Sequence, residues 1–377
     1  MKIELKYPYL TSLILSFVIV IGSFFLYHYQ QKGSILSLYS QLNPVPKPVT
    51  RKLPSKSNQE YIRILSIEGG GIYGILPAHI LEYIENKTGK HISELFDLMV
   101  GTSTGALETV LLTVPGKKGK PRYTAKDVLN IYNNESKFIF YSPWYHRILT
   151  LNGLLGPKYT TASRYQVFKK FLGDIYFDDL VNNVVIPAYG IEERSPLLFA
   201  NWLQKGVDDT NFSVTDLLMG AVSPPGMFPS VVFGSGSKRF ILADGAVFAN
   251  NPSLAAVLVA MSVYPNKQYI LVTLGTGSVK NFITGSREIV DWGDLQWSES
   301  IFPVILDGTA KFNNILLKRT FPFPLDIYYF NTEVSDFKNE IDNIAQWNIE
   351  RLNREGERML SENKNKIDEL IPRLLRP

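Results

Sequence analysis

Short apolar runs alternate with segments of helical periodicity along most of the chain. Apolar positions between 75 and 84 recur near helical spacing, and Gly89 is placed to cap that helix. Further helices are expected at 251–263 and within the charged region 335–375, whose polar positions predict a solvated face. The apolar runs predict buried strands at 61–67, 96–100, 184–190, 239–244 and 269–275. This alternation predicts an α/β fold, a three-layer sandwich whose mostly parallel central sheet is covered by helices.

The N-terminal region differs from this pattern. Residues 10–27 form an uncharged apolar run that would make a helix of about 27 Å, close to the hydrocarbon thickness of a bilayer. We expect an N-terminal transmembrane anchor in residues 1–30, and therefore a single-pass membrane location. A cleaved signal peptide and a buried helix are the alternatives. A linker rich in proline and lysine is expected over 31–60, followed by a catalytic domain over 61–377 that includes the C-terminal helical region.

The composition of the chain excludes several kinds of site and reaction. The 377 residues carry a formal net charge of +4, which does not indicate nucleic-acid binding. The absence of cysteine excludes disulfides, a thiol nucleophile and cysteine-ligated zinc. The four histidines are scattered without short spacing, so we expect no metal site, and we expect no cofactor.

The sequence GTSTG places Ser103 between Gly101 and Gly105, after a predicted strand and before a predicted helix. This G-x-S-x-G pattern is typical of a nucleophilic serine on a sharp turn. A hydrolase triad would need a histidine late in the chain, but only His146 follows the serine, and it lies in an aromatic stretch. A carboxylate is therefore expected as the base.

Asp244 is the favoured carboxylate because it ends the predicted strand 239–244, with Gly245 suited to a tight turn. In a parallel sheet, the end of that strand would lie at the same edge as Ser103. The alternative is that Asp244 only caps the loop or helix that follows.

The loop SIEGGGIYG after the first strand allows two functional interpretations. Gly69, Gly71 and Gly74 fit the dinucleotide pattern G-x-G-x-x-G, but that site needs an acidic residue near the end of the next strand, and Asp97 stands at its start. Backbone N–H groups of consecutive glycines at a helix N-terminus can instead form an oxyanion hole. We assign that role to Gly69, Gly70, Gly71 and Ile72; a tight turn without a ligand is the remaining alternative.

Together these residues resemble the patatin-like phospholipases and related acyl hydrolases. The motifs are Gly69–Gly74, Gly101–Gly105 and Asp244-Gly245-Ala246, and the resemblance covers roughly residues 61–280. It implies a patatin-like fold, a Ser103–Asp244 dyad without histidine, and backbone donors at Gly70, Gly71 and Ile72. The chain departs from the family at Tyr73, where Arg or Lys is usual, and at Glu68, where Asp is frequent.

The predicted function is a membrane-anchored serine acyl hydrolase that cleaves acyl esters of phospholipids or related lipids. Its predicted partners are such a lipid and the bilayer, with no nucleic acid. A catalytically silent lipid-binding or scaffold protein of the same fold is the alternative. The aromatic stretch 138–149 is interpreted as a core helix or loop in preference to an apolar lid or interfacial patch.

Overall fold

The structure is a computed structural model that describes residues 60–202, 212–233, 239–279, 293–320, 325–334 and 341–375. All of them belong to one unit that spans Lys47–Pro377. The predicted anchor, and the predicted linker apart from residue 60, lie outside the described residues and remain predictions. Within the described ranges, no helix combines the length and the apolar character needed to cross a bilayer.

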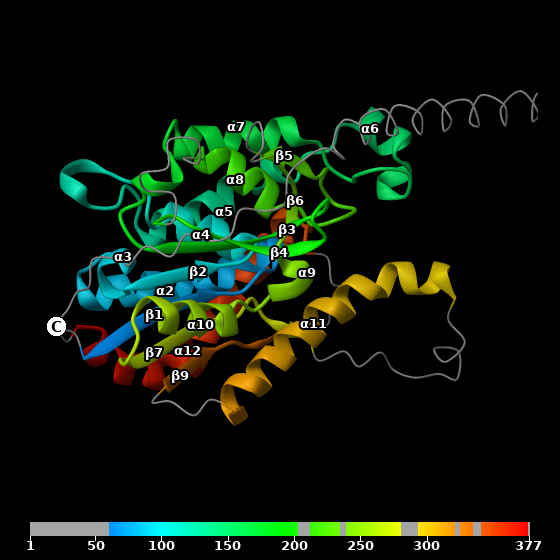
Figure 1. The fold of residues 1–377 in the computed structure, drawn as a ribbon. Coiled ribbons are helices and arrows are strands. Elements are labelled where there is room, and N and C mark those ends of the chain that lie inside the picture. The colour runs from blue at the N-terminus through cyan, green and yellow to red at the C-terminus, as the bar shows by residue number, and fades with distance from the viewer. Residues whose placement is uncertain are drawn as a thin grey trace, which may run out of the picture. The chain divides into compact units, whose positions relative to one another are not determined.

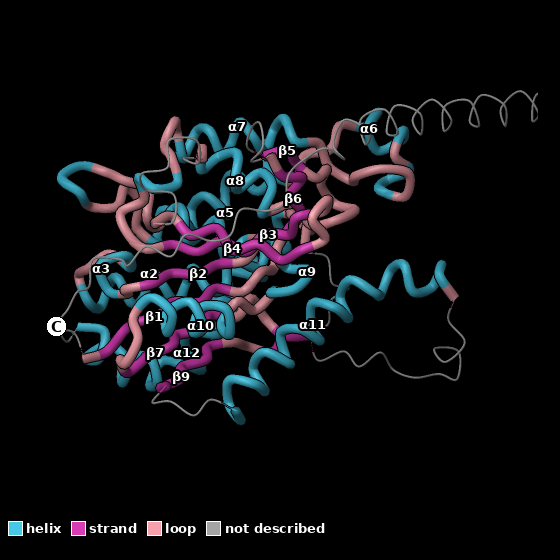
Figure 2. Tube along the Cα trace, viewed as in Figure 1, coloured by secondary structure: helices cyan, strands magenta, loops and turns pink. Residues whose placement is uncertain are grey.

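A mixed eight-stranded sheet forms the centre of the described region (Figure 2). The strand order is β5-β6-β3-β2-β1-β7-β9, and β4 pairs with β3. The strands from β9 to β3 are parallel, whereas β4, β5 and β6 are antiparallel to their neighbours. A separate parallel pair joins β8 and β10. The bounds are β1 Tyr61–Ile67, β2 Leu98–Gly101, β3 Val184–Gly190, β4 Ser195–Ala200, β5 Val231–Phe233, β6 Phe240–Asp244, β7 Gln268–Leu274, β8 Ser278–Val279, β9 Leu325–Phe330 and β10 Glu333–Val334.

Helices cover both faces of the sheet, which confirms the three-layer architecture (Figure 1). Alternate residues of β1 enter different cores: Ile62 and Ile64 pack with α10, whereas Leu65 and Ile67 pack on the side of α2, α4, α5 and α12. The helices are α2 Ile75–Thr88, α3 Ile92–Leu95, α4 Thr104–Leu111, α5 Ala125–Ile139, α6 Trp144–Leu149, α7 Thr161–Leu172, α8 Val214–Ala221, α9 Ala246–Ala249, α10 Ser253–Val263, α11 Asp294–Thr320 and α12 Gln346–Leu375.

The helices predicted at the two ends of the domain pack against each other. Helix α2 ends at Thr88 and is capped by Gly89, whose φ of 65° is left-handed as expected for a C-cap glycine. Helix α12 is amphipathic, and its apolar side chains, among them Leu352, Met359 and Leu370, enter the core beside α2. The charged positions of the C-terminal region therefore form the outer face of a helix that completes one core.

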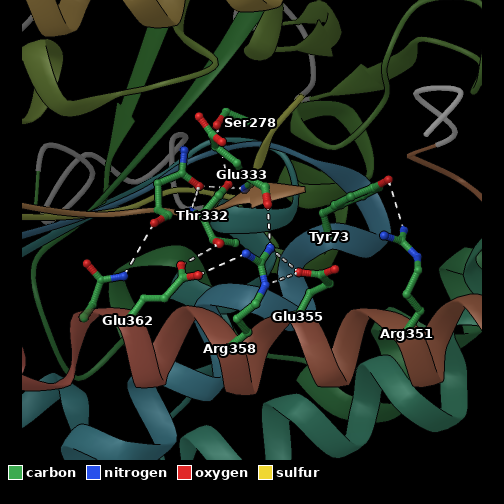
Figure 3. Close-up of polar contacts among 11 residues, drawn as sticks. Tyr73, Ser278, Thr332, Glu333, Arg351, Glu355, Arg358 and Glu362 are labelled. Atoms are coloured by element: carbon green, nitrogen blue, oxygen red, sulfur yellow. Dashed lines mark hydrogen bonds and ion pairs between the residues drawn. The ribbon is translucent and has the colours of Figure 1, made fainter. Parts of the chain in front are cut away.

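Polar contacts connect α12 to the small β8–β10 pair (Figure 3). Arg358 donates to the backbone carbonyl of Glu333 and pairs with Glu362. Glu362 also accepts a 2.9 Å hydrogen bond from the hydroxyl of Thr332. These contacts hold the chain that follows β7 and β9 against the last helix.

The direction of β6 differs from the expectation. It runs antiparallel to β3, with Asp244 opposite Ala188. Strand β2 pairs with β3 only as far as Val185, so β3 extends beyond the end of β2. Because β6 pairs with that extension and runs back along it, its last residue stops near the level of Ser103. The parallel-strand reason given for the position of Asp244 was therefore wrong, although the residue does lie beside Ser103.

The interpretation of 138–149 as core is wrong for its second half, although Ile139 and Ser142 are buried. Helix α6 has no buried residue, and Trp144 and Leu149 are 74% and 72% exposed. The exposed apolar side chains continue through the short 3₁₀ helix Leu151–Gly153 to Leu155. We call residues 138–155 the apolar lobe. Its composition resembles that of a core segment, but apart from Ile139 and Phe140 at its base its apolar side chains are largely exposed.

A buried ion pair connects the sheet to the end of α12. Asp97 accepts hydrogen bonds from the backbone N–H of Arg63 at 2.9 Å and from its Nε at 3.2 Å, and Arg63 Nη1 donates to the carbonyl of Leu374 at 2.7 Å. Asp97 therefore stabilises the packing at the start of β2 through Arg63, and it does not have the role of a ribose-binding carboxylate.

Asp97→Ala is expected to lower the free energy of unfolding by about 3–5 kcal/mol, because Arg63 would stay buried without its carboxylate. Urea titration followed by circular dichroism measures this loss. Asp174→Ala is the matched control, because the Asp174 side chain is 89% exposed in its pair with Lys169, and it should cost less than about 1 kcal/mol. Equal losses in the two variants would contradict the prediction.

Candidate active site

Ser103 occupies a strained turn between β2 and α4. Its φ of 55° and ψ of −119° lie in a region that non-glycine residues rarely adopt. It is the N-cap of α4 and is almost fully buried. This is the strand–turn–helix setting that the G-x-S-x-G pattern predicts for a nucleophile.

The two flanking glycines are required by close backbone approaches. A Cβ on Gly101 would lie 2.0 Å from the carbonyl oxygen of Gly105, and a Cβ on Gly105 would lie 2.3 Å from that of Ile67. Any side chain at either position would push α4 away from β1 and β2. The spacing of the motif thus follows from the packing that holds the serine.

Asp244 lies directly beside the serine. Ser103 Oγ donates to Asp244 Oδ2 at 2.6 Å, and the carboxylate is fully buried. Its other oxygen, Oδ1, accepts the backbone N–H of Ala246 at 2.8 Å. The two interpretations of Asp244, partner of the serine and cap of the following turn, are thus compatible. Gly245 permits the turn, because a Cβ there would lie 2.4 Å from the carbonyl oxygen of Pro187.

Burial controls the proton affinity of this carboxylate. It raises the pKa of Asp244 to about 6, while the hydrogen bonds from Ser103 and Ala246 and the charge of Arg164 act in the opposite direction. Asp244 therefore gains basicity and is still mainly ionised at neutral pH. His146 is not involved, because its Nε2 contacts the carbonyl of Pro157 at 2.8 Å in the apolar lobe.

Arg164 is a site residue that the sequence analysis missed. It is fully buried on α7, where its Nη2 donates to Ser223 Oγ at 2.8 Å, and the carbonyl of Ser223 accepts the N–H of Asp244. Its guanidinium carbon lies 3.9 Å from the ring centroid of Phe228. Burial lowers the pKa of Arg164 to about 9, so it remains a cation at neutral pH. The burial of Arg164 could have been inferred from helical spacing, because Arg164 lies on the same buried face of α7 as Val167, Phe168 and Leu172.

The glycine loop faces the serine. A Cβ on Gly69 would lie 3.2 Å from Ser103 Cβ, so the loop and the elbow are in close contact. Gly69 N–H donates to the carbonyl of Asn250, and Ile72 N–H donates to that of Ile341 at 2.8 Å. Among the described residues, no protein acceptor contacts the N–H groups of Gly70 and Gly71. These two are the donors free to bind an oxyanion.

The remaining loop positions have structural partners. A Cβ on Gly74 would lie 2.5 Å from the hydroxyl of Tyr132, which explains a glycine there. Tyr73, the position where the family usually has a cation, is buried, and its hydroxyl accepts a 3.4 Å hydrogen bond from Arg351 of α12 (Figure 3). A guanidinium therefore does lie beside this position, but it comes from the C-terminal helix.

Ser103 and Gly71 line a small apolar cavity. Its volume is about 30 Å³, and its walls include Leu107, Ile139, Phe168, Phe228 and Ile341. An apolar pocket beside a nucleophile suits the hydrocarbon part of an acyl ester. A larger open groove of about 920 Å³ lies between the start of the apolar lobe, α7 and β5, and Ser103 does not line it.

The fold and the arrangement of these motifs are patatin-like, and sequence similarity agrees. The family described as Patatin-like phospholipase matches residues 65–257, which contain the glycine loop, Ser103 and Asp244, and the chain belongs to that family.

Individual relatives are distant. Patatin-like protein 1 of Arabidopsis thaliana is 28% identical over 357 residues, which cover 82% of this chain and 85% of the relative. The Solanum tuberosum protein named "Probable inactive patatin-3-Kuras 1" is 28% identical over 288 residues, covering 70% of this chain and 75% of that protein. Among solved structures, VipD from Legionella pneumophila matches with a TM-score of 0.35 and 10% identity, covering 85% of this chain and 71% of that one.

Arg164→Met is expected to shift the pKa of Asp244 upward, because it removes the nearby positive charge that favours the carboxylate. The pH midpoint for labelling of Ser103 by a fluorophosphonate reports this shift. Arg164→Lys, which keeps the charge, should retain the wild-type midpoint. An unchanged midpoint in folded Arg164→Met protein would show that Arg164 does not tune the carboxylate.

Proposed function

We propose that this protein is a lipid acyl hydrolase that uses Ser103 as nucleophile and Asp244 as general base. The observation that carries the proposal is the 2.6 Å hydrogen bond from Ser103 Oγ to a fully buried Asp244. The strained turn presents the serine, and Gly71, one of the two glycines whose N–H groups have no protein acceptor among the described residues, lines the same cavity. Membership of the patatin-like phospholipase family supports lipid acyl esters as the substrate class.

In the acylation step, Ser103 Oγ attacks the ester carbonyl carbon while its proton passes to Asp244 Oδ2. The negative charge that develops on the carbonyl oxygen is stabilised by the N–H groups of Gly70 and Gly71, each worth about 2.7–4 kcal/mol in comparable sites. When the tetrahedral intermediate collapses, the C–O bond of the ester breaks. The leaving alcohol oxygen takes the proton from Asp244, and an acyl-serine remains.

Deacylation repeats these roles with water. Asp244 accepts a proton from a water molecule as the water oxygen attacks the acyl-serine carbonyl carbon. The new intermediate releases the fatty acid, and the proton on Asp244 returns to Ser103 Oγ. Aspartate is a weak base, so the raised pKa of Asp244 and the backbone donors both contribute to lowering the barrier.

We further propose phospholipids as the substrates and the bilayer as their source. The predicted anchor at 10–27 would hold the catalytic domain at the membrane surface. A catalytically silent lipid-binding protein is the competing function. A Ser103–Asp244 separation beyond hydrogen-bond reach would favour it, and the observed 2.6 Å does not.

Ser103→Ala and Asp244→Asn should each reduce release of fatty acid from phospholipid vesicles by at least about 100-fold, because each removes one member of the dyad. Mass spectrometry of the lipid products measures the loss. Ser253→Ala is the matched control, since Ser253 is another buried serine that neither lines the cavity nor belongs to the apolar lobe. Full hydrolysis by the Ser103→Ala variant, or fluorophosphonate labelling of another serine, would refute the assignment.

Hydrolysis should rise with pH up to about 6 and then level off. Asp244 must be ionised to accept the serine proton, and burial raises its pKa to about 6. Below that value, kcat/KM should fall about tenfold for each pH unit as the carboxylate becomes protonated. A pH profile measured on a water-soluble ester tests this. A midpoint near 4 would mean that Asp244 is hydrated in the working enzyme.

A further inference from the structure

The apolar lobe concentrates exposed hydrophobic side chains more than any other segment among the described residues. Ordinary proteins scatter exposed apolar residues singly, and contiguous ones mark interaction surfaces. Three of the lobe side chains, Trp144, Leu149 and Leu154, are 72–75% exposed. The exposed large apolar side chains of the lobe are Phe138, Tyr141, Trp144, Tyr145, Ile148, Leu149, Leu151, Leu154 and Leu155.

The lobe is held in place by hydrogen bonds. His146 Nε2 contacts the carbonyl of Pro157 at 2.8 Å, and the N–H of Leu155 donates to the carbonyl of Thr150 at 2.9 Å. At the base of the lobe, the N–H of Thr160 donates to the carbonyl of Tyr141 at 3.2 Å. The side chains therefore face solvent from a defined scaffold.

The charges of this region favour an anionic surface. From Ser136 to Gly173 the sequence contains no aspartate or glutamate, whereas Lys137 and Arg147 lie in or beside the lobe. Tryptophan and tyrosine prefer the headgroup level of a bilayer, and basic residues are attracted to anionic lipids. An uncharged protein partner would explain the apolar side chains but not this charge bias.

The base of the lobe reaches the candidate active site. Phe140 lines the same cavity as Ser103. Its ring lies 5.6 Å from that of Tyr159, and Tyr159 lies 5.3 Å from Phe228, another residue of the cavity wall. Figure 1 shows α6 on the side of the molecule toward which β1 and β2 run, where the elbow and the glycine loop follow those strands.

We propose that the apolar lobe docks onto an anionic lipid bilayer. Helix α6 and the turn after it enter the boundary between headgroups and acyl chains, and Arg147 binds lipid phosphates. Docking would place the cavity of Ser103 near the bilayer surface, and this role in substrate delivery rests on the proposed lipid hydrolase function. The docking itself does not depend on catalysis.

Because the chain has no cysteine, single probes can be attached to the full-length protein. Leu149→Cys and Leu154→Cys, each made with Ser103→Ala and labelled with an environment-sensitive fluorophore, are mixed with phosphatidylcholine vesicles that contain or lack phosphatidylglycerol. Quencher groups on the lipid acyl chains report entry of the label into the bilayer. Leu258→Cys is the matched control, an exposed leucine on α10, and Lys117→Cys samples a distant exposed loop.

Both lobe labels should shift to shorter emission wavelength and be quenched by the acyl-chain groups, more strongly with phosphatidylglycerol. The two control labels should stay in water. Arg147→Gln should lower the quenched fraction of the Leu149 label on anionic vesicles. The predicted anchor alone would bring all four labels to the vesicle, but it would not select the lobe labels for insertion.

Equal solvent exposure of lobe and control labels on vesicle-bound protein would overturn the docking proposal, and would point to a protein partner for the lobe. Equal insertion on neutral and anionic vesicles would remove the part assigned to Arg147. Since these measurements use the Ser103→Ala background, failed docking and failed hydrolysis are separate results. Inserted labels in a protein whose wild type releases no fatty acid would leave docking intact and refute the hydrolase.

Discussion

The close packing of α4 against the end of β1 is the contact on which the site depends. Gly105 lies so near the carbonyl of Ile67 that no side chain fits between them, and Gly101, at the end of β2, lies similarly near the carbonyl of Gly105. This packing forces Ser103 into its left-handed conformation at the start of the helix. The glycine loop continues from the same end of β1, so one contact fixes both the nucleophile and the N–H groups that face it.

The sequence contained most of this local geometry. Strand β1 was predicted with its observed bounds, and the glycine spacing identified both loops because backbone approaches dictate those glycines. Asp244 was selected because it ends a predicted strand, and the resemblance to the patatin-like family implied its pairing with Ser103, but the predicted direction of β6 was wrong. The direction of β6 is fixed by its pairing with β3, and that pairing depends on contacts between residues distant in sequence.

Long-range packing accounts for the features that were missed. Arg164 lies next to the dyad only because α7 packs against α8, which packs against β6, and Arg351 reaches Tyr73 only because α12 returns to α2. The apolar lobe was misjudged for a related reason. An apolar sequence shows that a surface will avoid water, but only the fold shows whether another part of the protein is available to cover it.

The small cavity connects the lobe to the glycine loop, because Phe140 and Gly71 both line it. A volume of about 30 Å³ holds roughly one or two water molecules, far less than a fatty acyl chain. Ile341 narrows the cavity and occupies the N–H of Ile72, and its neighbour Asp342 is bound by Lys158 at 2.6 Å and Tyr159 at 2.7 Å, at the base of the lobe. An acyl chain can enter only if some of these walls move. The contacts of Asp342 with Lys158 and Tyr159 hold one of these walls, and they join the lobe to the site.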